Sequence, residues 1–156
     1  MKSTRNSILL TLSWVALLAI FFAQVEIQIE GSAGWAVNLP TWRIEQHWLL
    51  DLFWGGRAMT GYHAWVFPLI AMFFHFPMFM LQQWSLALQA RTIACIIVFW
   101  IIEDASWFIM NPAFGWHALR PETVPWHHHW WWGLPVDYWL GSAAAFVLFY
   151  LSYRRK

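Results

Sequence analysis

The sequence predicts an all-α integral membrane protein with four transmembrane helices and a tryptophan-rich extracytoplasmic cap that contains a short interfacial helix. Of the 156 residues, 60% are hydrophobic and only 11% are charged, whereas soluble domains are usually about 25% charged. Four apolar segments come close to the roughly 20 residues that a helix needs to cross a bilayer. Fifteen tryptophans exceed what a globular core of this size needs. The length suits a single polytopic domain, 1–156.

The four predicted spans are residues 7–24, 63–81, 92–110 and 138–153. The first has the charged start and apolar stretch of a signal peptide, but no clear small-residue cleavage site follows, so we expect a retained helix. The last is short and begins after Pro135, with Asp137 as a candidate N-cap. Gly141 and Ala145 form a small-xxx-small pair that suits close helix packing. A weakly hydrophobic helix without special packing explains this pair about equally well.

Basic residues set the expected topology, because cytoplasmic loops carry the excess of lysine and arginine. They lie before the first segment, between the second and third, and at the end of the chain: Lys2, Arg5, Arg91, Arg154, Arg155 and Lys156. This distribution predicts a multi-pass protein of the cell (plasma or inner) membrane with both termini in the cytoplasm. The long connections, 25–62 and 111–137, then face the outside.

The first outer connection contains "LPTWRIEQHWLLDLFWGG", which predicts an interfacial helix capped near Thr41 and stopped at Gly55. His47 and Asp51 are four residues apart there, a spacing that suits either one metal ion or an ordinary salt-bridge stripe. The second connection is rich in proline and tryptophan and includes "PWHHHWWW". It cannot be a regular helix throughout, and we expect an ordered lid near the headgroup region.

Two adjacent acids, Glu103 and Asp104, interrupt the apolar stretch "VFWIIEDASWFIM" of the third predicted span. An ionised residue at the centre of a spanning helix costs about 2.5–3.5 kcal/mol on insertion scales. The acids therefore predict a buried polar pocket that opens to the extracytoplasmic side. His75, in the second predicted span, lies at a similar depth, so a contact with one acid is possible if the two helices are antiparallel neighbours.

Three interpretations of these acids compete. The first is a structural acid–histidine pair that fixes helix register. The second is a metal site, for which imidazole and carboxylate ligands suit a divalent zinc, iron, manganese or copper ion. The third is proton handling by a desolvated carboxyl group. The acid pair beneath a histidine-rich lid favours the metal site over proton handling.

The predicted metal ligands are His75, His117, His127, His129, Glu103 and Asp104. The signatures HExxH, paired ExxH and HxxxH are absent, so this prediction depends on composition and depth. The run of three histidines also fits a row of amphipathic rings at headgroup depth. Met72, His75 and Met78 could hold copper(I) or a haem, although methionine at helical spacing usually serves packing.

Two classes of function follow from the sequence. The first is a metal-dependent enzyme that acts on a lipid or another apolar substrate, with Glu103 and Asp104 as catalytic groups. The second is a non-catalytic subunit of a larger membrane complex that contacts a cofactor or pigment. Membrane lipids are expected partners in both classes, and other membrane subunits in the second.

A net charge of +1 without a basic run gives no support to nucleic-acid binding. The single cysteine, Cys95, excludes an internal disulfide.

Overall fold

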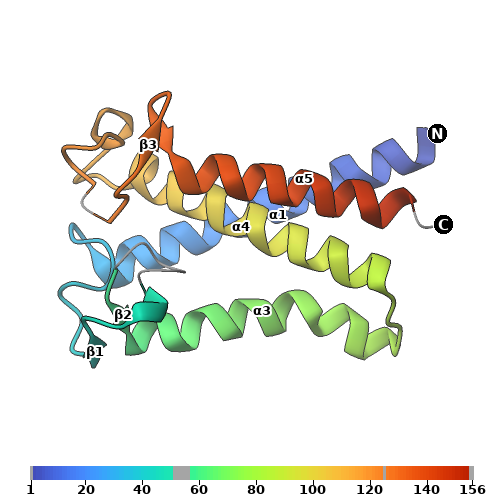
Figure 1. Cartoon of the computed structure of the whole chain (residues 1–156), viewed down its shortest axis with the longest axis horizontal. Helices are drawn as coiled ribbons and strands as arrows, with labels where there is room; N and C mark the ends of the chain where they lie inside the picture. The colour runs from blue at the N-terminus through green and yellow to red at the C-terminus, as the bar shows by residue number, and fades with distance from the viewer. Residues whose placement is uncertain (1, 51–56, 125, 155–156) are drawn as a thin grey trace.

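The chain folds into a bundle of four long helices with its two long loops gathered at one end (Figure 1). The structure is a computed structural model that describes residues 2–50, 57–124 and 126–154. The helices are α1 (Lys2–Glu30), α3 (Gly61–Leu81), α4 (Leu86–Met110) and α5 (Val136–Arg154). Both chain termini, and the short connection between α3 and α4, lie at the end opposite the long loops. We call these the terminal end and the loop end of the bundle.

Three helical segments are long and apolar enough to cross a membrane: Asn6–Glu30, Gly61–Leu81 and Leu86–Met110. The first of them extends six residues beyond the predicted limit at Gln24. Helix α5 forms where the fourth span was predicted, but it is not among these three, so its crossing of the membrane stays a prediction. Asp137 lies in the first turn of α5 rather than at its N-cap, because the helix already begins at Val136.

Helix α4 is the centre of the bundle and packs most extensively against α1 and α5, and less against α3. Small residues on one face of α1, Ala19 and Ala23, are fully buried and allow close approach of the helix backbones. Val15 on the same face packs with Phe99 of α4 in one core cluster. This arrangement leaves α1, α3 and α5 around α4, so residues from all four helices can meet at the loop end.

The predicted small-residue pair of α5 packs as expected. Ala145 is 2% exposed, and a side chain at Gly141 would meet Ile101 and Ile97 of α4. The close approach of α4 and α5 therefore depends on the missing side chain at Gly141.

Gly141→Val is expected to lower the free energy of unfolding by about 1–3 kcal/mol, the usual cost of overpacking a close contact. Chemical unfolding of the detergent-solubilised protein, followed by circular dichroism, measures this loss. Ala144→Val is the matched control, because Ala144 is exposed on the same helix. Equal losses in both variants would contradict the assigned packing.

The loops contain short strands that the all-α prediction missed. β1 (Arg43–Ile44) pairs with β2 (Met59–Thr60), and β3 (Trp130–Trp131) pairs with β4 (Leu134–Pro135), both antiparallel. The predicted interfacial helix is therefore wrong at its start, since Arg43 and Ile44 form a strand and helical residues begin only at Trp48. The rest of that prediction, including Asp51, falls at 51–56, outside the described residues.

The second loop has no regular α-helix in its described part. It contains a single 3-10 turn, η1 (Trp116–Ala118), before the β3–β4 hairpin. Val124 of this loop is fully buried against Ile27 of α1 and Phe108 of α4. Trp126 stacks on Phe108 with a centroid distance of 5.4 Å. These contacts fix the loop to the ends of two helices.

Candidate functional site

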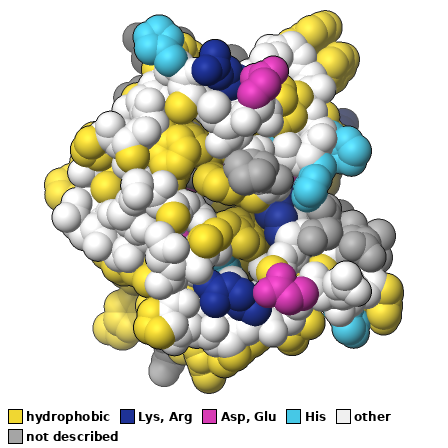
Figure 2. Space-filling model, turned by 90° about the vertical axis from the view of Figure 1, so that its left-hand side faces the viewer, with side chains coloured by type: hydrophobic (Ala, Val, Ile, Leu, Met, Phe, Trp, Pro, Cys, Tyr) yellow, Lys and Arg dark blue, Asp and Glu magenta, His cyan; other side chains and the backbone are white. Residues whose placement is uncertain are grey.

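A cavity of about 460 Å³ lies at the loop end, where the four helices meet. Figure 2 looks onto this end and shows a hollow in the centre of the face, with charged side chains near its rim. Five carboxyl groups line the cavity, from α1, α4 and α5: Glu26, Glu30, Glu103, Asp104 and Asp137. The two sequence-predicted acids therefore belong to a larger acidic cluster.

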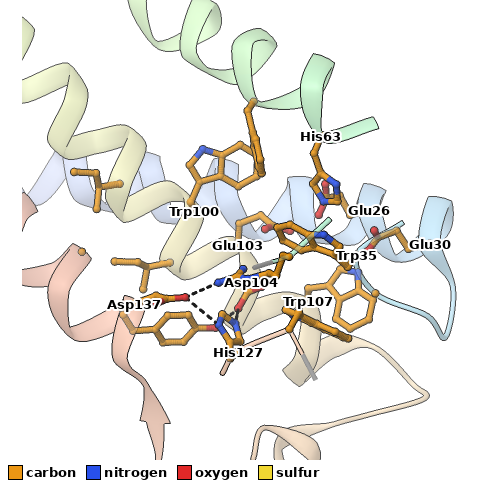
Figure 3. A pocket seen from close by; sticks show the side chains of 18 residues that line it. Glu26, Glu30, Trp35, His63, Trp100, Glu103, Asp104, Trp107, His127 and Asp137 are labelled. Carbon is orange, nitrogen blue, oxygen red and sulfur yellow. Dashed lines mark hydrogen bonds and ion pairs between the residues drawn. The ribbon is translucent and has the colours of Figure 1, made fainter. Parts of the chain in front are cut away.

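One set of contacts links Asp104 to the second loop and to α5 (Figure 3). The Tyr138 hydroxyl donates a hydrogen bond to Asp104 Oδ2, and His127 Nε2 lies 3.0 Å from the same oxygen. His127 Nδ1 lies 3.3 Å from Asp137 Oδ2, which also pairs with Arg57 Nη2 at 2.6 Å. A histidine whose two ring nitrogens each face a carboxylate can donate a hydrogen bond to both carboxylates only as an imidazolium, because only then do both nitrogens carry a proton.

The charge of His127 follows from this geometry. Burial alone would lower the pKa of His127, but hydrogen bonds with Asp104 and Asp137 outweigh burial and raise the pKa above the usual 6.5. The His127 side chain is only 4% exposed, so its charge depends on these partners. Asp104 is thus balanced by His127, and Asp137 by His127 and Arg57.

A stabilising contribution from this imidazolium should be complete below pH about 6.5 and should be lost as the pH rises through the higher folded pKa. The wild type is therefore expected to lose more thermal stability than His127→Gln between pH 6 and pH 9. Thermal unfolding at several pH values measures the difference. His129→Gln, at an exposed neighbour, should follow the wild type. Parallel curves for the wild type and His127→Gln would contradict the ion-pair assignment.

The second set of contacts joins the acids of α1 and α4. The Tyr62 hydroxyl donates to Glu26 Oε1 at 2.5 Å, and the carboxyl groups of Glu26 and Glu103 lie within hydrogen-bonding reach of each other. Two carboxyl groups can share such a bond only if one of them carries a proton. Glu103 is 4% exposed, and its Oε1 has no hydrogen-bond partner in the described part of the chain. A buried carboxyl oxygen thus remains free inside the cavity.

Glu30 completes the acidic face of α1. Its Oε1 accepts a hydrogen bond from the backbone N–H of Ala36 at 2.5 Å. No lysine, arginine or histidine forms an ion pair with Glu26, Glu30 or Glu103 among the described residues. The cavity therefore holds three carboxyl groups that have no ion-pair partner among the residues the structure describes.

Aromatic side chains form much of the remaining wall. Trp35 stacks on His63 at 4.1 Å, and the Arg57 guanidinium lies 4.9 Å from the Trp35 ring. Phe67 of α3 meets Trp100 of α4 edge to face at 4.8 Å. The resulting surface is apolar and rich in π electrons, with the carboxyl groups set into it.

The structure brings together only some of the predicted site residues. Glu103, Asp104 and His127 line the cavity. His75 lies elsewhere, with Nε2 at 2.8 Å from the Gln89 amide and Nδ1 at 2.7 Å from the Ala71 carbonyl oxygen, so the possible acid contact does not form. His117 and His129 are exposed and do not line the cavity.

The predicted metal site gains no support from this arrangement. Within residues 2–50, 57–124 and 126–154, no group of three or more histidine, cysteine, aspartate or glutamate side chains is placed to hold a metal ion. His127 uses both ring nitrogens on carboxylates, which leaves neither free as a ligand.

Sequence reasoning missed Glu26 and Glu30, although a signal for them exists. Both continue the buried face of α1 at helical spacing from Ala19 and Ala23. The predicted span ended at Gln24, so the two acids were assigned to a loop. Arg57, Tyr62 and Tyr138 carried no local signal, because their roles depend on distant partners.

No protein-family model matches this chain, and neither the curated proteins nor the solved structures contain a match. Any functional assignment therefore depends on the residues of this chain.

Proposed function

We propose that this protein is a membrane-embedded acid–base enzyme that transfers protons to and from an unsaturated, apolar membrane lipid. The carrying observation is the free carboxyl oxygen of Glu103, which is buried in an aromatic cavity beside a second carboxyl group, Glu26. A carboxyl group in such surroundings can hold a proton that water does not compete for. The proposal includes α5 as a fourth span and a cavity that opens to the extracytoplasmic side.

The membrane orientation rests on charge and on the fold. Arg91 and the basic residues at both chain ends would lie in the cytoplasm by the positive-inside rule. Both termini are at one end of the bundle, and the cavity is near the other (Figure 1). The proposed site thus lies toward the outer face, within reach of lipid.

The chemistry would proceed in two proton transfers. Glu103 gives its proton to one carbon of a double bond, whose π electrons form the new C–H bond and leave a carbocation on the other carbon. The aromatic rings of Trp100 and Phe67, which line the cavity, would stabilise that positive charge. A neighbouring C–H then gives its proton to a carboxylate such as Glu26, and its electron pair forms a shifted double bond. Between turnovers the protonated Glu26 loses its proton to water and Glu103 takes one from water, so the proton given to the next lipid comes from solvent.

Solvent deuterium tests this proposal without a known substrate. Protein in liposomes of the source organism's total membrane lipid extract is incubated in D₂O buffer, and mass spectrometry detects deuterium on lipid carbon. We expect incorporation with the wild type and its loss in Glu103→Gln. Glu122→Gln, at an exposed loop position, should keep the activity. Incorporation no greater than in protein-free liposomes would contradict the proposal.

A non-catalytic role in a larger complex is the second candidate. Trp131 and Trp132 stack at 4.4 Å and are 53% and 76% exposed, which would suit contact with another subunit or a pigment. Purification in a mild detergent tests this role. Stoichiometric partner chains or a visible absorption band would favour it over the enzyme. Metal analysis of the same preparation tests the sequence-predicted divalent metal.

A further inference from the structure

We infer that the cavity is a binding site for an organic cation, namely an ammonium group carried on a hydrocarbon chain. This inference goes beyond the proposed activity, because it names a class of ligand that the site would hold whether or not it is transformed. It rests on the charge, the wall and the size of the cavity.

The charge of the site is unbalanced. Arg57 and His127 line the cavity, and both already have aspartate partners. Arg57 pairs with Asp137, and His127 lies between Asp137 and Asp104. Glu26, Glu30 and Glu103 have no ion-pair partner in the described part of the chain. The free Oε1 of Glu103 lies in a side chain that is 4% exposed and lines the cavity. A ligand with one positive charge would give these carboxyl groups a partner.

The wall of the cavity selects the kind of cation. Trp100 and Phe67 present aromatic surface, which attracts cations through the ring quadrupole. Burying a charge is favourable only if partners replace its water, and an alkylated ammonium is weakly hydrated. A small metal ion needs several oxygen or nitrogen ligands converging on one point, and the described residues provide no such group. The site therefore suits a diffuse cation.

The size of the cavity agrees with this choice. A volume of about 460 Å³ falls in the range of small-molecule sites, about 300–1,000 Å³. It would take the ammonium group with part of an alkyl chain. Ile97 and Ile101 of α4 supply apolar surface for that chain. The ammonium would replace the proton between Glu26 and Glu103 with a fixed positive charge.

Binding of radiolabelled dodecyltrimethylammonium to the protein in lipid nanodiscs tests the inference. The wild type should bind it saturably, and unlabelled 2,2-dimethyltetradecane, its neutral isostere with carbon in place of nitrogen, should compete at least about tenfold more weakly. Glu103→Gln and Glu30→Gln should each weaken binding about tenfold or more, since each removes a carboxylate beside the cation. Glu122→Gln is the matched control and should bind like the wild type.

Equal competition by the neutral isostere would overturn the inference, as would unchanged affinity in both glutamine variants of the cavity. The isostere comparison uses only the wild type, so it holds even if a variant fails to fold. The two proposals can fail separately. Deuterium transfer without ammonium binding would reject the cation site alone, and ammonium binding without deuterium transfer would reject the enzyme alone.

Discussion

Asp104→Ala is expected to lower the free energy of unfolding by about 3 kcal/mol, near the lower end of the range for breaking a buried charge pair. The substitution removes the carboxylate that faces both His127 Nε2 and the Tyr138 hydroxyl. His127 is 4% exposed, so its charge would lose a partner without gaining water. Asp104 itself is 27% exposed, which is why we expect the lower end of the range. Denaturant unfolding of the detergent-solubilised protein at pH 6 measures the loss.

Asp137→Ala is the matched comparison, because Asp137 also contacts His127 but its side chain is 55% exposed. We expect a loss of less than about 1 kcal/mol there, as for other solvent-exposed pairs. Similar losses in the two variants would show that Asp104 is not the buried centre of the network.

The helices of this protein were predictable because their cause is local. Each long apolar segment carries its own signal, and all four predicted segments are helical in the structure. The ends of the helices were less predictable. Glu26 and Glu30 are charged residues, yet they continue the buried face of α1. A span boundary placed by hydropathy alone excludes such residues, because their burial depends on what the neighbouring helices place opposite them.

The site was predictable only in part, for the same physical reason. Acids inside an apolar run are a local signal, and the two acids that it pointed to, Glu103 and Asp104, line the cavity. The choice among histidines depends on loop geometry, which the sequence does not determine locally. Of the four histidines predicted as ligands, His127 alone contacts an acid among the described residues, from 23 residues along the chain. Arg57 reaches Asp137 across 80 residues. The short strand of Arg43 and Ile44 likewise depends on a partner beyond the next loop.

The acid–histidine pair and the free carboxyl group turn out to be different parts of the cavity. Asp104 has the histidine partner that a register-fixing pair requires. Glu103 faces another carboxyl group and leaves one oxygen unpaired, which contributes nothing evident to stability. Residues kept at a cost to stability are typical of functional sites. Substitution of Glu103 should therefore separate stability from activity.

In Glu103→Gln, we expect proton transfer to lipid to fall by about 10²–10⁴-fold, the usual contribution of a positioned acid–base group. The free energy of unfolding should rise in the same variant, by about 1 kcal/mol. Glutamine keeps the shape of the side chain, and its amide can donate to Glu26 without a shared proton. Deuterium incorporation and denaturant unfolding, measured on one preparation, give both values. A variant that lost activity and stability together would instead assign Glu103 a structural role like that of Asp104.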